Sequence, residues 1–261
     1  MVTIYDYDMA TNSNTSPDVL DELTEKDSVQ LKSLVAENPS TSIQTLTNLA
    51  RVDTPFIQRM VAKNPNTPVE VLEELAKHFS SIVRLAVATN KNVPSYILDV
   101  LALDENSDVV YEVASNPYTP LYRLVALSKN ADARIRWNVA SNTNAPIELL
   151  SALSKDDDFD VKLKVAENPN TPAKILVDLF EQLGESIYEA IAGNPNTPPE
   201  ILVNLAGNDY WPIRCIVAAN KNTPAEALRG LIGDYRSIIR FKAFKNPNCP
   251  MELKVEYLLS A

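Results

Sequence analysis

The pentapeptide Asn-Pro-Asn-Thr-Pro decides the fold, because it occurs intact at residues 64–68, 168–172 and 194–198. Its first asparagine belongs to a series that continues along the chain without insertion or deletion. Members of the series lie 26 residues apart and are Asn12, Asn38, Asn64, Asn90, Asn116, Asn142, Asn168, Asn194, Asn220 and Asn246. A fixed period of this length is typical of repeat proteins, in which one supersecondary unit recurs.

Each 26-residue unit predicts two short helices. The first begins at Thr-Pro, as in Thr-Pro-Val-Glu at 67–70, where threonine is a suitable N-cap, proline suits the first helical position and glutamate completes a capping box. Leucines at helical spacing follow, as at Leu72 and Leu75. The second helix carries a Val-Ala pair before the repeated asparagine, and it ends there because the next proline disfavours helical continuation.

The repeated asparagine closes each unit. An Asx turn, in which the side-chain oxygen accepts from the backbone two residues later, is favoured over a left-handed C-cap, because a following proline makes the left-handed conformation awkward. Stacked units would also let each side-chain amide bond to the neighbouring loop. We interpret the series from Asn38 to Asn246 as a structural ladder, with a row of ligand-binding amides as the alternative.

A single helix pair cannot bury its own leucines, so neighbouring units have to stack and share a continuous core. The sequence therefore predicts an all-α fold, an α-solenoid of about nine and a half two-helix repeats. We expect residues 1–261 to form a single helical-repeat solenoid, with a half-unit at residues 1–11 and a capping helix at about 250–260.

The unit Val-Ala-x-Asn-Pro-Asn-Thr-Pro-x-Glu-x-Leu-x-x-Leu-Ala resembles the repeat of the leucine-rich repeat variant family, a relative of HEAT-type helical solenoids. The resemblance covers residues 12–257 and implies a right-handed superhelix of paired helices. The unit is longer than the usual family period of about 24 residues, so we expect the second helix to be α-helical. Some relatives carry an iron–sulfur centre ahead of their repeats, but no cysteine precedes Cys215, so that cofactor is not implied here.

Composition and charge argue against several classes of protein. The 34 acidic and 24 basic residues give a net charge of −10, unlike a protein whose whole surface binds nucleic acid or acidic membranes. Five glycines form no phosphate-binding motif, and one histidine with two cysteines leaves little for a metal cluster or a catalytic triad. We expect no enzyme activity, cofactor or metal. With no signal peptide or membrane span in the sequence, a cytoplasmic location is predicted.

The strongest binding candidate is a cationic column in the second helix, one residue after its first core position. Six of its nine members are cationic: Lys32, Gln58, Arg84, Val110, Arg136, Lys162, Tyr188, Arg214 and Arg240. The adjacent column varies and keeps aromatic residues, as a contact surface does. From these two columns, the binding hypothesis selects Arg84, Arg136, Lys162, Arg214, Arg240, Tyr111 and Trp137.

Two interpretations of the cationic column stay open at this point. The cations face a ligand, or they pair with loop acids of the same or the next unit, in which case the aromatic residues fill gaps between helices. Candidate acids for such pairs are Asp53, Asp108, Asp157, Asp160 and Asp209.

The favoured function is a non-enzymatic scaffold that binds a protein or peptide along its surface. Stacked helices lie ~8–10 Å apart, which matches the ~10.5 Å between acidic residues seven apart on a helix, so the favoured partner is an acidic segment. The chain itself is expected to be a monomer that binds no membrane. The alternative is a nucleic-acid-binding solenoid similar to HEAT-repeat DNA glycosylases, with Glu189 beside Tyr188 as its carboxylate, although the acidic chain makes nucleic acid a poor partner.

Overall fold

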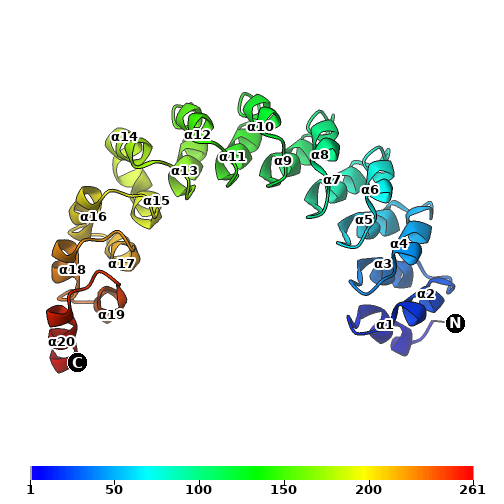
Figure 1. Ribbon diagram of the computed structural model, residues 1–261, viewed down its shortest axis with the longest axis horizontal. Helices are drawn as coiled ribbons and strands as arrows, with labels where there is room; N and C mark the ends of the chain where they lie inside the picture. The colour runs from blue at the N-terminus through cyan, green and yellow to red at the C-terminus, as the bar shows by residue number, and fades with distance from the viewer. Residues whose placement is uncertain (1, 261) are drawn as a thin grey trace. The chain divides into compact units, whose positions relative to one another are not determined.

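The computed structural model describes residues 2–260, which form helices and loops without strands. The chain divides into two compact units, Met1–Lys129 (unit 1) and Asn130–Ala261 (unit 2). Within each unit the helices alternate between a layer of odd-numbered helices and a layer of even-numbered helices (Figure 1). The expectation of one domain over residues 1–261 stays a prediction.

Unit 1 contains five odd-numbered and five even-numbered helices in its described residues. The odd layer consists of α1 (Ile4–Thr11), α3 (Val29–Glu37), α5 (Pro55–Lys63), α7 (Ser81–Thr89) and α9 (Ser107–Ser115). The even layer consists of α2 (Pro17–Thr24), α4 (Ile43–Ala50), α6 (Val69–Leu75), α8 (Ser95–Leu101) and α10 (Leu121–Leu127).

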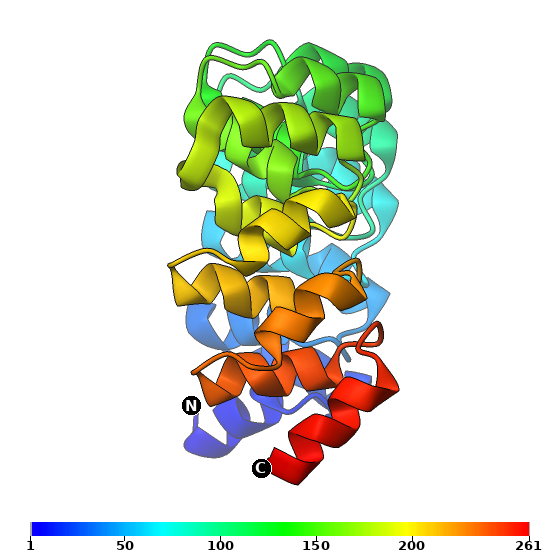
Figure 2. The same cartoon turned by 90° about the vertical axis from the view of Figure 1, so that its left-hand side faces the viewer.

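Unit 2 repeats this arrangement, and Figure 2 shows its helices, coloured from green to red, stacked one beside the next. The odd layer consists of α11 (Ala133–Ser141), α13 (Phe159–Glu167), α15 (Tyr188–Gly193), α17 (Trp211–Ala219) and α19 (Ser237–Lys245). The even layer consists of α12 (Ile147–Leu153), α14 (Ala173–Leu183), α16 (Pro199–Ala206), α18 (Ala225–Leu231) and α20 (Met251–Ser260), and the short 3₁₀ helix η1 (Gly184–Ile187) joins α14 to α15.

The helices follow the 26-residue register of the sequence. Odd-numbered helices start at Pro55, Ser81 and Ser107, and each ends at a repeated asparagine with extended backbone. The odd-numbered helices are α-helical, as expected. The structure therefore confirms an all-α solenoid of stacked two-helix repeats.

The core lies between the two layers and continues from repeat to repeat. Leu72 of α6, Val87 of α7 and Leu98 of α8 are fully buried. Each buried side chain of this kind contributes about 1.5–3 kcal/mol. Because the side chains of one repeat are covered by the next, the stacking itself removes the apolar surface from water.

Several even-numbered helices begin differently from the sequence expectation. In α6, Pro68 occupies the N-cap, the helix starts at Val69, and no side chain caps it. Thr67 is buried, and its hydroxyl donates to the backbone oxygen of Val61 in α5. The expected capping box at residues 67–70 is therefore wrong, because the threonine satisfies a buried carbonyl of the preceding helix instead.

One repeat of unit 2 departs from the regular pattern. Helix α14 continues to Leu183 and is followed by Gly184, whose φ of +57° is strained for residues with a side chain. The chain then forms η1, so that α15 begins late and contains only six residues. The shortened helix α15 supplies Glu189, Ala190 and Gly193 to the lining of a hollow.

Candidate functional site

The repeated asparagines join consecutive 26-residue repeats through their side chains. Asn64 Oδ1 accepts from the backbone N–H of Asn66 at 2.9 Å, which is the Asx turn expected from the sequence. Its Nδ2 donates to the backbone oxygens of Ala36 and Asn38 in the preceding repeat, at 2.8 Å each. Both kinds of bond recur at Asn38, Asn90, Asn168, Asn194, Asn220 and Asn246. Asn116 and Asn142 are buried and make the same turn.

Three arginines of the cationic column form ion pairs with aspartates of the protein itself. Arg84 on α7 donates through Nε and Nη2 to Asp104, at 2.6 and 2.8 Å. Its Nη1 donates to the backbone oxygens of His78 and Phe79. The side chains of Arg84 and Asp104 are only 10 % and 5 % exposed. This two-bond geometry is the strong form of an arginine–carboxylate pair.

Unit 2 contains the same arrangement twice. Arg136 pairs with Asp156 through two bonds of 2.8 Å, and Arg214 pairs with Asp234 through bonds of 2.7 and 3.4 Å. Each aspartate lies 20 residues after its arginine, in the loop of the next repeat. The geometry of these three arginines is therefore that of the internal-pairing interpretation.

The acids proposed from the sequence are not the partners of these arginines. Asp209, for example, accepts from Arg214 Nη1 through its backbone oxygen. Nη1 of the guanidinium group bonds to the backbone of the loop that precedes its own helix. Nε and Nη2 therefore point to the following loop, where they bond to an aspartate. The spacing of 20 residues was the signal in the sequence that would have identified the correct acids.

Hydrogen bonding keeps these pairs ionised. The bond from Arg136 holds the pKa of Asp156 below its ordinary value, against burial, which raises it, and the N–H of Asp158 lowers the pKa further. Burial is the largest influence on the pKa of Asp104 and raises it, but Arg84 and a backbone N–H together lower that pKa below the ordinary value. At neutral pH the three pairs are thus fully charged.

The other predicted binding residues lie in several places. Lys162 is half-buried, and Arg240 donates Nη1 to two backbone oxygens; neither pairs with a carboxylate in the described part of the chain. Tyr111 lies half-buried on α9 in unit 1. Trp137 on α11 is half-buried, and the Lys164 ammonium lies 4.8 Å from its ring centroid. Three of the seven predicted binding residues are thus engaged in internal ion pairs, and the binding role of all seven stays a prediction.

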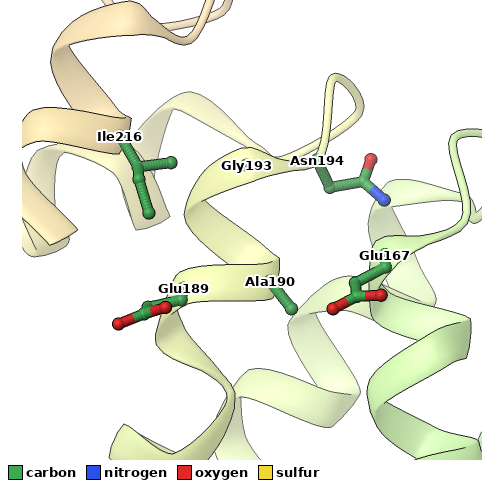
Figure 3. A pocket seen from close by; sticks show the side chains of 6 residues that line it. All are labelled: Glu167, Glu189, Ala190, Gly193, Asn194 and Ile216. Carbon is green, nitrogen blue, oxygen red and sulfur yellow. The ribbon is translucent and has the colours of Figure 1, made fainter. Parts of the chain in front are cut away.

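The odd layer of unit 2 contains a hollow of about 320 Å³. Its lining comes from three consecutive odd-numbered helices: Glu167, Glu189, Ala190, Gly193, Asn194 and Ile216. In Figure 3, Ala190 lies between the two glutamates, and the Glu167 carboxylate points toward α15, whereas that of Glu189 points away from Glu167. Glu167 is paired with Lys164, its neighbour on α13.

Small residues create this hollow. The positions of Ala190 and Gly193 in α15 correspond to Lys164 and Glu167 in α13 and to larger side chains in most other repeats. A Cβ atom at Gly193 would lie 3.8 Å from Ile216 Cγ2, so the site has room for a methyl group. The sequence identified Glu189 as a candidate carboxylate but did not predict the hollow that it lines. The signals for the hollow were Gly193 in a column of larger residues and Gly184 just before α15.

The last odd-numbered helix combines cations with exposed aromatic surface. Phe241 on α19 is 47 % exposed, and Lys245 Nζ lies 5.7 Å from its ring centroid. Lys242 is half-buried on the same helix. Residues 211–261 carry eight lysines and arginines and four acids, whereas residues 1–210 carry 16 and 30. The end of unit 2 thus has a net charge of +4 in a chain that is otherwise acidic.

Two further features limit the chemistry of the described residues. Residues 2–260 contain no group of three or more histidine, cysteine, aspartate and glutamate side chains placed to hold a metal ion. None of the described helices is long and apolar enough to cross a membrane.

The stacked helix pairs, the buried asparagine bonds and the surface that changes from repeat to repeat define a helical-repeat solenoid. No protein-family model matches the chain, and no curated protein matches it. A solved leucine-rich repeat variant, described as having a novel repetitive structural motif, is 21 % identical with a TM-score of 0.55, and the match covers 84 % of this chain and 86 % of that one. An engineered protein matches at 15 % identity with a TM-score of 0.43, over 98 % and 92 % of the two chains. The first similarity shows that this chain has the fold of a leucine-rich repeat variant, as its repeat unit implied.

Proposed function

We propose that this scaffold binds a segment of another protein along the odd layer of unit 2, with acidic residues of the segment against α19. The observation that carries the proposal is the hollow at Ala190 and Gly193. Along the stack, a lysine that lies over an aromatic ring flanks the hollow on each side, on α13 and on α19.

The hollow and the aromatic rings supply the apolar part of the proposed interface. Phe241 is aromatic, a residue class enriched in the cores of interfaces, and Trp137 of α11, the odd-numbered helix before α13, lies under Lys164. An apolar side chain of the partner fits between the small residues Ala190 and Gly193, with Ile216 as its apolar neighbour. Three inter-helix steps from α13 to α19 span about 24–30 Å, which an extended segment of about nine residues covers.

Charge fixes the direction in which such a segment lies. Lys242 and Lys245 have no carboxylate partner within residues 2–260, so their charges are available to an acidic segment. Arg240 adds a third cation on the same helix. Glu189, together with Glu167 in its pair with Lys164, disfavours acidic residues at the hollow, which favours α19 as the position of the acidic part of the partner. The same two carboxylates oppose a nucleic-acid backbone, so we do not extend the proposal to nucleic acid.

Binding of a synthetic peptide tests the proposal. The probe is a fluorescein-labelled peptide of about ten residues, with glutamates in one half and a leucine at its centre, and fluorescence anisotropy measures its affinity. The double variant Lys242→Glu/Lys245→Glu is expected to weaken binding at least about tenfold, because it reverses the charges that face the glutamates. Gly193→Gln, which fills the hollow, is expected to weaken binding by a similar factor.

Lys155→Glu/Lys174→Glu is the matched control, because it changes the net charge equally at two exposed lysines away from the odd layer. We expect this control to bind within about twofold of the original chain. Equal losses in both double variants would show that only net charge matters and would refute a binding site at α19. Stronger binding of a peptide with lysine in place of glutamate would overturn the acidic preference.

A further inference from the structure

The even layer of unit 1 exposes a group of large apolar side chains. The exposed residues on α8 and α10 and in the loop after α8 are Tyr96, Val100, Leu103, Leu121, Tyr122 and Val125. In unit 2, Ile147 is the one large hydrophobic residue exposed on the described helices α12, α14, α16 and α18, and the other exposed apolar residues of its even layer lie on the last helix, α20: Met251, Val255, Leu258 and Leu259. A concentration of apolar surface of this kind marks an interaction site on a folded protein.

A groove runs into this surface between α6 and α8. It encloses about 210 Å³ and is lined by Glu73, Ala76, Lys77, Tyr96, Ile97 and Val100. Ala76 is buried, whereas Tyr96 and Val100 are more than half exposed on the adjacent helix. A side chain of a partner can therefore enter between two helices of the layer. We call the groove together with the exposed apolar residues of α8 and α10 the α6–α10 face.

The tyrosines of this face are held in place by neighbouring helices. The Tyr96 hydroxyl donates to Glu73 on α6, and the Tyr122 hydroxyl donates to Asp99 on α8. Arg123 also donates to Asp99, and its guanidinium lies 5.5 Å from the Tyr122 ring centroid. Because the rings are already fixed, a partner that covers them loses little side-chain entropy.

Both tyrosines are neutral at neutral pH, because the ordinary pKa of tyrosine is about 10, and their hydrogen bonds shift that pKa further upward. The bond to Glu73, with some burial, raises the pKa of Tyr96 above its ordinary value. The bond to Asp99 raises the pKa of Tyr122 in the same way. At neutral pH both rings therefore present a neutral, amphipathic surface.

Acidic residues lie along the α6 side of the groove. Glu73 lines it, the charge of Glu70 acts on Tyr96, and Glu74 is exposed on the same helix. Lys77 is the cation that lines the groove. The rim therefore favours a partner with basic residues beside its apolar ones, and it repels anionic surfaces such as acidic membranes.

We propose that the α6–α10 face binds an amphipathic helix of a partner protein, with aliphatic residues in the groove and lysine or arginine toward α6. A helix suits the site, because the ridge of its side chains at i and i+4 fits a groove between two packed helices. This surface lies in the other unit and the other layer from the proposed acidic-segment site. It is thus a second, chemically opposite binding site on the same scaffold.

Binding of a designed helix tests this inference. The probe is a fluorescein-labelled amphipathic peptide of about 18 residues, or five helical turns, with leucines on one face and lysines on the other, and anisotropy measures its affinity. We expect Val100→Lys to weaken binding at least about tenfold, because it places a charge in the groove where the leucines of the peptide would be buried. Ile147→Lys, the same chemical change at an exposed even-layer position in unit 2, is expected to leave the affinity within about twofold.

A second peptide with glutamate in place of lysine separates recognition from general adhesion. We expect it to bind at least about tenfold more weakly than the lysine peptide. Equal affinity of the two peptides, or equal effects of Val100→Lys and Ile147→Lys, would overturn the inference, and so would preferential binding of anionic lipid vesicles. Circular dichroism establishes that both variants keep their helices. None of these outcomes bears on the acidic-segment site, whose variants lie in unit 2.

Discussion

Arg214 on α17 and Arg240 on α19 occupy the same position in consecutive repeats, yet their surroundings differ. Nη1 of each arginine donates to two backbone oxygens of the preceding loop. The other edge of Arg214 meets Asp234, with Nε at 2.7 Å from Oδ2. No carboxylate among the described residues pairs with Arg240. Arg214 thus links two repeats through an ion pair, whereas Arg240 bonds to backbone oxygens through Nη1.

The residue 20 positions later accounts for this difference. An aspartate follows Arg84, Arg136 and Arg214 at that spacing, but a serine follows Arg240. Asp6 and Lys26 form an ion pair at the same spacing with the charges exchanged. Whether a cation of the column is ion-paired therefore depends on the residue 20 positions later. The column by itself does not show which of its cations are paired.

The largest expected effect is the loss of a buried pair. We expect Arg214→Ala to lower the free energy of unfolding by about 2–4 kcal/mol, because it leaves the Asp234 carboxylate buried without its cation. Arg240→Ala is expected to cost less than about 1 kcal/mol, since it removes only bonds to backbone oxygens at a half-exposed site. Urea unfolding followed by circular dichroism measures both values. Equal losses would contradict the distinction between the two arginines.

Much of the fold could be predicted because it depends on local repetition. A strict 26-residue period, with apolar pairs and leucines at fixed positions, is compatible with stacked helix pairs and with little else. The Asx turn at Asn64 was likewise predictable, because it involves a side chain and the backbone two residues later. The capping box at 67–70 failed because Thr67 bonds to Val61 in the preceding helix, and no rule based on nearby residues includes that carbonyl.

The candidate sites were harder to predict, for a physical reason. Whether Arg136 faces solvent or Asp156 depends on the packing of one loop against the next helix. The hollow at Gly193 comes from absent side chains and from the interruption after Gly184, and motif searches respond to residues that are present. The groove beside Tyr96 likewise forms only when α6 and α8 lie side by side.

A smaller effect concerns the dependence of stability on pH. The pKa of Asp156 is lower in the folded chain than its ordinary value, chiefly through the bond from Arg136. The pair therefore stabilises the fold fully above the unfolded pKa of about 3.9, and this contribution is lost as the pH falls through the folded value. We expect the difference in melting temperature between the original chain and Arg136→Ala to be constant near neutral pH and to narrow below about pH 4. For Arg240→Ala the corresponding difference is expected not to narrow, and a parallel narrowing would contradict the comparison.

The smallest expected effect comes from building a pair where the sequence lacks one. Gln58 occupies the arginine position of its repeat, and His78 lies 20 residues later. Gln58 is buried, its Nε2 donates to the backbone oxygen of Ala50, and its Oε1 has no hydrogen-bond partner among the described residues. His78 Nδ1 accepts from the N–H of Ser80 at 3.0 Å, just as aspartate oxygens do in the paired loops. The loop at His78 thus forms the same turn as the loops of the ion pairs, but the site lacks the arginine and the aspartate.

A double-mutant cycle measures what the added charges contribute. We expect Gln58→Arg alone to destabilise the fold, because it buries a cation without a carboxylate. Combined with His78→Asp, it is expected to show a favourable coupling of about 0.5–1 kcal/mol in urea unfolding. Lys162→Arg with Gln182→Asp has the same 20-residue spacing, but Gln182 lies within α14, where no loop presents its side chain to the column. That control cycle should show no coupling, because spacing alone does not form the pair. A coupling of similar size in both cycles would mean that general electrostatics, and not the loop geometry, joins arginine to aspartate in this scaffold.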